Sequence, residues 1–215
     1  MKRLKPRSIG LIITLLLGAS LAVGQMRSHK LGVGVNGAAY LFTSDFPNTS
    51  VGGGGGISLS YSVFEHIGLR MMLGSGELKY SDAASHGYTT PMFSGNLYLS
   101  YDLIPHGNFN PFIFGGVGGI YFDPHSDLGV YPTGGFDKID VNYLGGVGFD
   151  YFFSEFFSIT VSGEAALTNT DWLDGLKSGA SKDAYDRVNV EFRYYFFDQD
   201  YITRLIKALQ DRMKR

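Results

Sequence analysis

Apolar and polar residues alternate with a period of two over most of the chain. In residues 188–197 (VNVEFRYYFF) every even-numbered position is aliphatic or aromatic, whereas the odd-numbered positions include Glu191 and Arg193. Successive side chains of a β-strand point to opposite faces, so this segment is predicted to be a strand with one apolar and one charged face. We expect the apolar face to contact lipid and the charged face to line the inside of a small barrel.

Seven earlier segments show the same kind of pattern. They are residues 31–41, 57–63, 67–73, 93–102, 112–122, 139–151 and 158–167. Together with 188–197 they give eight strands of roughly the 9 to 11 residues that a tilted strand needs to cross a membrane. The segment 112–122 is apolar on both faces, so its register is left open. No window after residue 24 is apolar for long enough to form a transmembrane helix.

Short and long connections alternate between these segments. The short ones lie near residues 64–66, 104–110 and 152–157, and the long polar ones are 43–56, 81–91, 123–138 and 168–186. Alternate hairpin turns lie at the same end of a barrel, so all four long loops are expected to emerge together. Short periplasmic turns with long external loops are typical of bacterial outer-membrane barrels.

Four stretches carry a family resemblance. They are NPFIFGGVGGIYFDP (110–124), GGVGFDYFFSEFFSI (145–159), the TDWLDG loop (170–175) and the closing strand that ends in YYFF. With them, residues 31–197 resemble the small outer-membrane β-barrel superfamily that includes OmpA-like barrel domains and OmpX-like proteins. The resemblance implies an all-β fold, an eight-stranded antiparallel up-and-down transmembrane β-barrel, in the outer membrane of a diderm bacterium. It also implies outer-membrane lipid as a partner.

The two ends of the chain differ from the barrel segment. Residues 1–24 combine a basic start, an apolar stretch and a small-x-small pattern before Gln25, as a secretory signal peptide does, and an N-terminal membrane anchor is the alternative. Residues 25–198 form the predicted barrel. Residues 199–215 carry an apolar stripe at helical spacing with basic flanks, which predicts a short amphipathic C-terminal helix in the periplasm. This helix is a candidate docking site for a periplasmic partner.

Composition narrows the function classes. Removal of residues 1–24 leaves 14 of the 18 basic residues against 20 acidic residues, so we expect no nucleic-acid partner. Cysteine is absent, which excludes a disulfide framework. Glycine makes up 30 of the 215 residues, and glycines inside strands mark tight curvature or close backbone approach, both of which suit a narrow barrel.

Charged residues of both signs fall on the predicted inner faces. They are Lys30, Arg70, Asp102, Asp150, Glu164, Glu191 and Arg193. An eight-stranded barrel is wide enough only for side chains to fill it. Because unpaired buried charges are costly, we expect a salt-bridge network that plugs the lumen, in which Lys30 and Arg193 reach Glu191.

Other motifs give weak signals. Gly32 to Gly37 satisfies G-x-G-x-x-G but lies inside a predicted strand, and residues 52–56 (GGGGG) lack the Lys-Ser/Thr of a P-loop and are interpreted as a flexible external loop. The segment 169–175 lacks the spacing of a calcium loop, and the histidines lack metal-ligand spacing. We therefore expect no cofactor and no metal.

Catalytic chemistry has little support in the sequence. The adjacent sets His125-Ser126-Asp127 and Ser85-His86 both lie in predicted external loops, where nothing fixes their geometry. The preferred hypothesis is a non-enzymatic barrel with a structural or surface-interaction role, whose external loops, including Trp172, meet a protein or another surface ligand. Two alternatives stay open. One is an outer-membrane lipid-modifying enzyme, and the other is a soluble exported barrel of lipocalin type with its apolar face turned inward.

Overall fold

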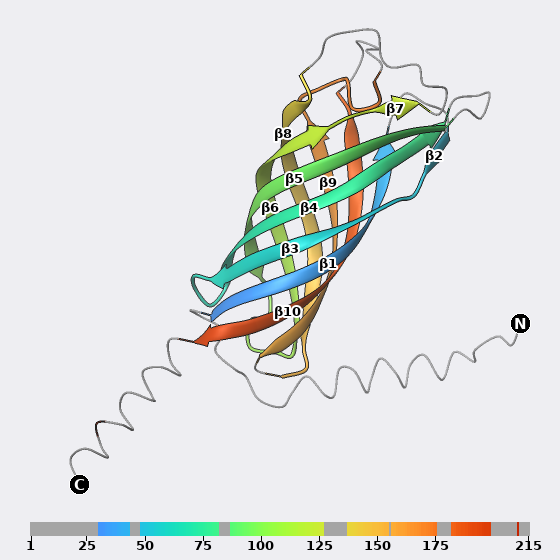
Figure 1. Ribbon diagram of the computed structural model, residues 1–215. Helices are drawn as coiled ribbons and strands as arrows, with labels where there is room; N and C mark the ends of the chain where they lie inside the picture. Colours follow the sequence, from blue (N-terminus) through green and yellow to red (C-terminus); the bar gives the residue numbers. More distant parts are fainter. Residues whose placement is uncertain are drawn as a thin grey trace, which may run out of the picture.

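The chain forms one closed barrel of antiparallel strands that run obliquely around its axis (Figure 1). The computed structural model describes residues 30–43, 48–81, 87–126, 137–154, 156–175, 182–198 and Gln210. The wall strands are β1 (Lys30–Thr43), β3 (Gly52–Ser62), β4 (Ile67–Ser81), β5 (Gly87–Asp102), β6 (Phe109–Phe122), β8 (Ile139–Phe152), β9 (Phe157–Thr168) and β10 (Ala184–Asp198). Two short strands, β2 (Asn48–Ser50) and β7 (His125–Ser126), pair with β4 and β5.

Sequential strands pair with one another, and the last strand returns to the first. Val35 of β1 lies opposite Phe192 of β10, and the pairing of β4 with β5 completes the ring. This confirms the predicted eight-stranded antiparallel up-and-down barrel, in which closure leaves no unpaired edge on the wall strands. We call the end that carries the connections after β1, β4, β6 and β9 the long-loop end, and the opposite end the short-turn end.

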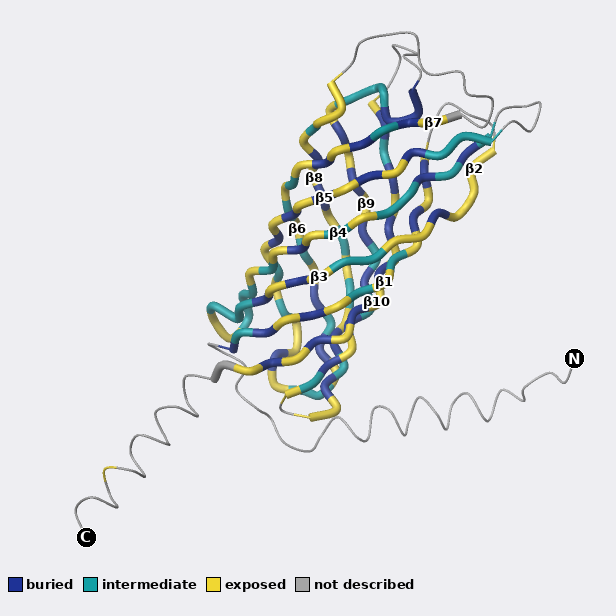
Figure 2. Tube along the Cα trace, viewed as in Figure 1, coloured by how far each residue is buried: buried dark blue, intermediate teal, exposed yellow. Residues whose placement is uncertain are grey.

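The two faces of each strand differ sharply in exposure (Figure 2). On β10, Val188 and Phe192 are exposed, whereas Asn189 and Glu191 are buried. The apolar stripes therefore face outward, as predicted. A lipocalin-type barrel would need them inside, so that alternative is wrong.

The structure fixes the register of β6. Phe112, Ile120 and Phe122 point into the lumen and are almost completely buried, whereas Ile113, Val117 and Tyr121 are exposed outside. The sequence left this register open because the lumen next to β6 is itself aromatic, so both faces of the strand are apolar.

The prediction of a flexible loop at residues 52–56 was wrong. This segment belongs to β3 and pairs with β1 and β4. A Cβ atom built on Gly54 or Gly76 would lie within about 3 Å of the Tyr40 ring, so glycine there leaves room for a tyrosine inside a narrow barrel.

The connection between β4 and β5 is also shorter than predicted. Both strands continue beyond the expected limits, to Ser81 and from Gly87, so only residues 82–86 join them. That connection is no longer than the one between β5 and β6, and the strict alternation of long and short connections fails at this hairpin. The predicted signal peptide (1–24) and the predicted helix in 199–215, Gln210 apart, lie outside the described residues.

Candidate functional site

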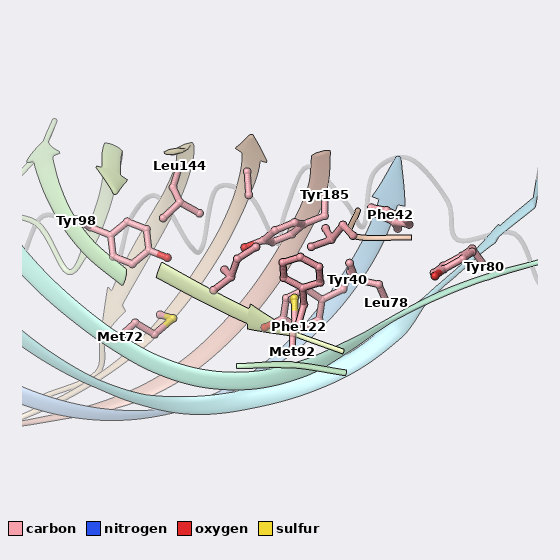
Figure 3. Close-up of a cluster of buried hydrophobic side chains, with 13 residues drawn as sticks. Tyr40, Phe42, Met72, Leu78, Tyr80, Met92, Tyr98, Phe122, Leu144 and Tyr185 are labelled. Carbon is pink, nitrogen blue, oxygen red and sulfur yellow. The ribbon is translucent and has the colours of Figure 1, made fainter. Parts of the chain in front are cut away.

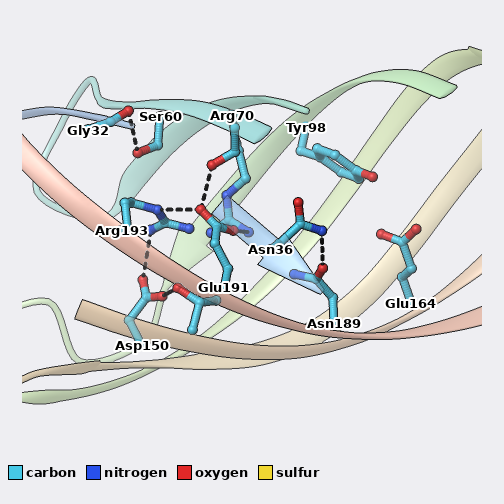
Figure 4. A network of polar contacts seen from close by, with 12 residues as sticks. Gly32, Asn36, Ser60, Arg70, Tyr98, Asp150, Glu164, Asn189, Glu191 and Arg193 are labelled. Carbon is cyan, nitrogen blue, oxygen red and sulfur yellow. Dashed lines mark hydrogen bonds and ion pairs between the residues drawn. The ribbon is translucent and has the colours of Figure 1, made fainter. Parts of the chain in front are cut away.

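The lumen next to the short-turn end contains a charged network centred on Glu191 (Figure 4). Arg193 Nε lies 2.9 Å from Glu191 Oε1, and Arg70 Nη1 lies 3.7 Å from Glu191 Oε2. The Ser58 hydroxyl donates a third contact to Glu191 Oε1, at 2.5 Å. Glu191 and Arg193 are both inward-pointing residues of β10, so alternation alone places them two residues apart on the same face.

Asp150 extends this network to the neighbouring strands. Its Oδ2 lies 3.6 Å from Arg193 Nη1, and its Oδ1 accepts a hydrogen bond from Thr160. A cavity of about 30 Å³ lies beside Arg193 at the short-turn end, lined also by Lys30 and Asp102. A single water molecule needs about 10–15 Å³ of such space, so the cavity is small. No ion pair joins Lys30 to Glu191 within the described part of the chain.

A second charged layer crosses the lumen nearer the long-loop end. Glu164 of β9 pairs with Arg187 of β10 at 2.7 Å, and Arg187 Nη2 donates to Tyr98 Oη at 2.6 Å. These residues are buried. Glu164 was predicted to lie inside, whereas Arg187 was missed because the predicted strand began one residue after it. The period-two pattern through Asn189 and Glu191 would have included Arg187 had the strand been extended.

Amide side chains lie between the two charged layers and beyond the second layer toward the long-loop end. The Asn36 amide donates to Asn189 Oδ1 at 2.5 Å, and the Asn142 amide lies 3.0 Å from Tyr185 Oη and 3.3 Å from Asn96 Oδ1. Asn96, Asn142 and Asn189 are each at most 2 % exposed. Asn36 Oδ1, Asn142 Oδ1 and Asn189 Nδ2 have no hydrogen-bond partner among the described residues, so the amides form separate contacts beside the charged residues.

An apolar and aromatic layer closes the lumen at the long-loop end (Figure 3). It includes Tyr40, Phe42, Leu78, Tyr80, Met92, Phe122, Leu173 and Tyr185. Leu173 comes from the connection after β9, and it is completely buried because this connection folds back over the barrel. Trp172 packs partly buried against the same layer. Its expected contact with an external partner stays a prediction.

Specific hydrogen bonds hold this returning segment in place. Tyr80 Oη donates to the Asp174 carbonyl and Thr90 Oγ1 donates to the Leu173 carbonyl, both at 2.8 Å. The Leu173 amide donates to Asp183 Oδ2, also at 2.8 Å. We call Leu173, its aromatic neighbours and these bonds the Leu173 cap.

Three of the five candidate catalytic residues lie outside the described residues. His125 lies beside Asp123, with its Nδ1 2.6 Å from the Asp123 carbonyl, whereas Ser85, His86 and Asp127 lie outside the described residues. Among the described residues, no group of three or more His, Cys, Asp or Glu side chains is arranged to hold a metal ion. No helix in the described part of the chain is long and apolar enough to span a membrane.

The family model of the outer membrane protein beta-barrel domain matches residues 11–196. The chain therefore belongs to this family, and it is a bacterial outer-membrane β-barrel protein. A comparison with curated protein sequences found no match.

Solved structures with the same fold show little sequence identity to this chain. Neisserial surface protein A is 15 % identical, with a TM-score of 0.53, and the match covers 77 % of this chain and 97 % of that chain. OprG from Pseudomonas aeruginosa is 16 % identical, with a TM-score of 0.52 and coverage of 81 % and 100 %. The outer membrane enzyme PagL matches at a TM-score of only 0.38, with 13 % identity and coverage of 74 % and 97 %.

Proposed function

We propose that this protein is a non-enzymatic barrel with a closed lumen, whose long-loop end faces the outside of the cell and makes its interactions there. The observation that carries this proposal is the stacking of three buried layers across the lumen: the Glu191 network, the Glu164–Arg187 layer and the Leu173 cap. Each layer joins strands from different sides of the barrel.

Ion flow would require these layers to open. Breaking one side of a buried, hydrogen-bonded ion pair costs about 3–5 kcal/mol, because the remaining charge is left uncompensated. Glu191 is shared by Arg70, Arg193 and Ser58, so moving it breaks several contacts at once. Such a lumen suits a rigid scaffold better than a channel.

Planar-bilayer recording of the refolded full-length protein tests this proposal. The wild type is expected to give no stable large conductance, whereas Glu191→Ala and Arg193→Ala should leak. Glu77→Ala is a matched control, because it also removes a charge but from the exposed Glu77–Lys79 pair. Heat-dependent gel mobility verifies that each variant is folded. A large, reproducible conductance from the wild type would refute the closed lumen.

The lipid-modifying enzyme is the competing function. Nucleophilic catalysis needs a serine or an equivalent group beside a base that a third group orients. In the described part of the chain, His125 Nε2 lies 3.8 Å from Asp123 Oδ2, and both side chains are partly exposed. A lipid A mass profile of a deletion strain separates the two functions, since altered acylation would favour the enzyme.

The same proposal assigns one partner to the long-loop end of the barrel and another to the C-terminal residues. The segments around the Leu173 cap would present the surface for an external protein or surface ligand, and residues 199–215 would engage a periplasmic partner. Crosslinking on intact cells, with and without residues 199–215, separates partners of the two ends.

A further inference from the structure

Arg70 makes few contacts for a guanidinium group that is largely removed from solvent (Figure 4). Its side chain is 11 % exposed, and its ion pair with Glu191 Oε2 spans 3.7 Å, which exceeds the usual length of a hydrogen bond. The ring of Phe112 covers one face of the group, with its centroid 5.3 Å from Arg70 Cζ. Within the described residues, none of the five N–H groups of Arg70 makes a hydrogen bond.

A guanidinium in such a position needs an acceptor along its edge, because buried polar groups are nearly always hydrogen-bonded. The cavity of about 30 Å³ at the short-turn end is lined by Arg70 and can hold this acceptor. It has room for roughly two water molecules or for one small ion. Cations from three strands line it, namely Lys30 of β1, Arg70 of β4 and Arg193 of β10.

The carboxylates of this part of the lumen lie closer to Arg193 than to Arg70. Glu191 Oε1 is 2.9 Å from Arg193 Nε, and Asp150 Oδ2 is 3.6 Å from Arg193 Nη1. Asp102 also lines the cavity, but no described contact joins it to Arg70. Three cations and three carboxylates are present, and the shortest contacts gather on Arg193. The charge of Arg70 therefore has the weakest local compensation.

We propose that this cavity binds one small inorganic anion of the size of chloride, held by the edge of the Arg70 guanidinium. An anion accepts several hydrogen bonds at once, and bonds between two charged groups are roughly twice as strong as neutral ones. Ser62 lines the same cavity and makes no hydrogen bond to another described residue, so its hydroxyl is a further donor. Larger anions such as sulfate or gluconate exceed the available space.

Urea unfolding of the refolded full-length protein in detergent tests the proposal. Sodium chloride is compared with sodium gluconate at equal ionic strength, so that charge screening is the same. The unfolding midpoint of the wild type is expected to be higher in chloride and to rise with chloride concentration, because a ligand that binds only the folded state stabilises it.

Arg70→Met keeps an unbranched side chain beside Phe112 but removes the donors, so its midpoint should no longer differ between the two salts. Lys79→Met is the matched control, because it also removes a cation but from the exposed Glu77–Lys79 pair. The difference between chloride and gluconate should persist in this variant.

Bromide locates the ion directly and does not depend on any variant. Crystals of the wild type grown in sodium bromide are expected to show an anomalous scattering peak in the cavity, beside the Arg70 guanidinium. The same crystals grown in gluconate should show no such peak.

Three outcomes would overturn the inference. They are a cavity that contains only water in bromide crystals, bromide peaks on the outer surface alone, which would mean an adventitious ion only, and an equal chloride effect in Arg70→Met. The three layers across the lumen do not depend on the anion. A closed barrel without a bound halide would therefore leave the proposed function intact.

Discussion

At the scale of single residues, the contacts inside the lumen depend on side-chain size as much as on charge. Gly34 of β1 points inward toward Glu191, and a Cβ atom built there would overlap the Glu191 carboxylate and lie 2.7 Å from the Ser58 hydroxyl. The missing side chain leaves the space in which Glu191 meets Ser58 and Arg193. A glycine in this strand is therefore part of the charged network.

Gly34→Val is expected to destabilise the barrel, by about the 3–5 kcal/mol that breaking a buried ion pair costs. Gly37→Val is the control, because Gly37 points outward and a Cβ there has no neighbour within 4 Å. Urea unfolding in detergent, followed by tyrosine and tryptophan fluorescence, measures both variants. Equal midpoints for the two variants would contradict the role given to Gly34.

The sequence predicted the Arg193–Glu191 contact but not the other pairs of charged residues in the lumen. Alternation was sufficient to place Glu191 and Arg193 on the inner face of one strand. Pairing depends on the register between strands far apart in the chain, as for Ser58 and Glu191, which are 133 residues apart. For this reason Lys30 was assigned to Glu191, although it lines the cavity beside Arg193. The Glu164–Arg187 pair was missed because the predicted strand began one residue after Arg187.

At the scale of the element, β10 combines two environments in one strand. Its outer face carries Phe192 and Tyr194, whose rings pack with Phe157 of β9 at centroid distances of 5.6 and 5.0 Å. Its inner face carries the charged and amide residues of the lumen. Aromatic rings near strand ends are typical of the girdles at membrane interfaces.

Phe192→Asp or Tyr194→Asp is expected to block assembly, whereas Asn189→Asp should be tolerated. A lipid-facing Arg or Lys costs up to about 2–4 kcal/mol at mid-bilayer, and acids or interfacial positions cost less. An aspartate at 189 keeps the oxygen that accepts the Asn36 hydrogen bond. Heat-dependent gel mobility of the variants is the assay, and equal assembly of all three would mean that the faces are assigned wrongly.

The alternation of apolar and polar residues predicted the strands better than it predicted where they begin and end. The pattern located all eight wall strands, but it stopped β4 at residue 73 and began β5 at 93, although the strands continue to Ser81 and from Gly87. The strand residues beyond the predicted limits carry polar and charged side chains on their outer faces, such as Glu77 and Lys79. Beyond the membrane a strand needs no apolar face, so the sequence there resembles a loop.

At the scale of the whole molecule, the barrel is expected to reach the outer membrane by export with removal of residues 1–24. Cleavage before Gln25 should leave a mature product that resists extraction by salt or carbonate, because its apolar outer surface is held by lipid. Mass-spectrometric sequencing of the purified N-terminus provides the measurement. An intact Met1 in the membrane fraction would contradict the prediction.

The position of the network along the chain also bears on biogenesis. Glu191, Arg193 and Arg187 all belong to β10, the last wall strand to be synthesised, whereas Arg70, Asp150 and Glu164 come from earlier strands. Until β10 docks against β1 and β9, those three residues lack the oppositely charged partners that they have in the finished barrel. Pairing of β10 with β1 therefore closes the barrel and neutralises the charges of its interior in a single event. A chain truncated before residue 184 would present uncompensated charges in its interior to the assembly machinery.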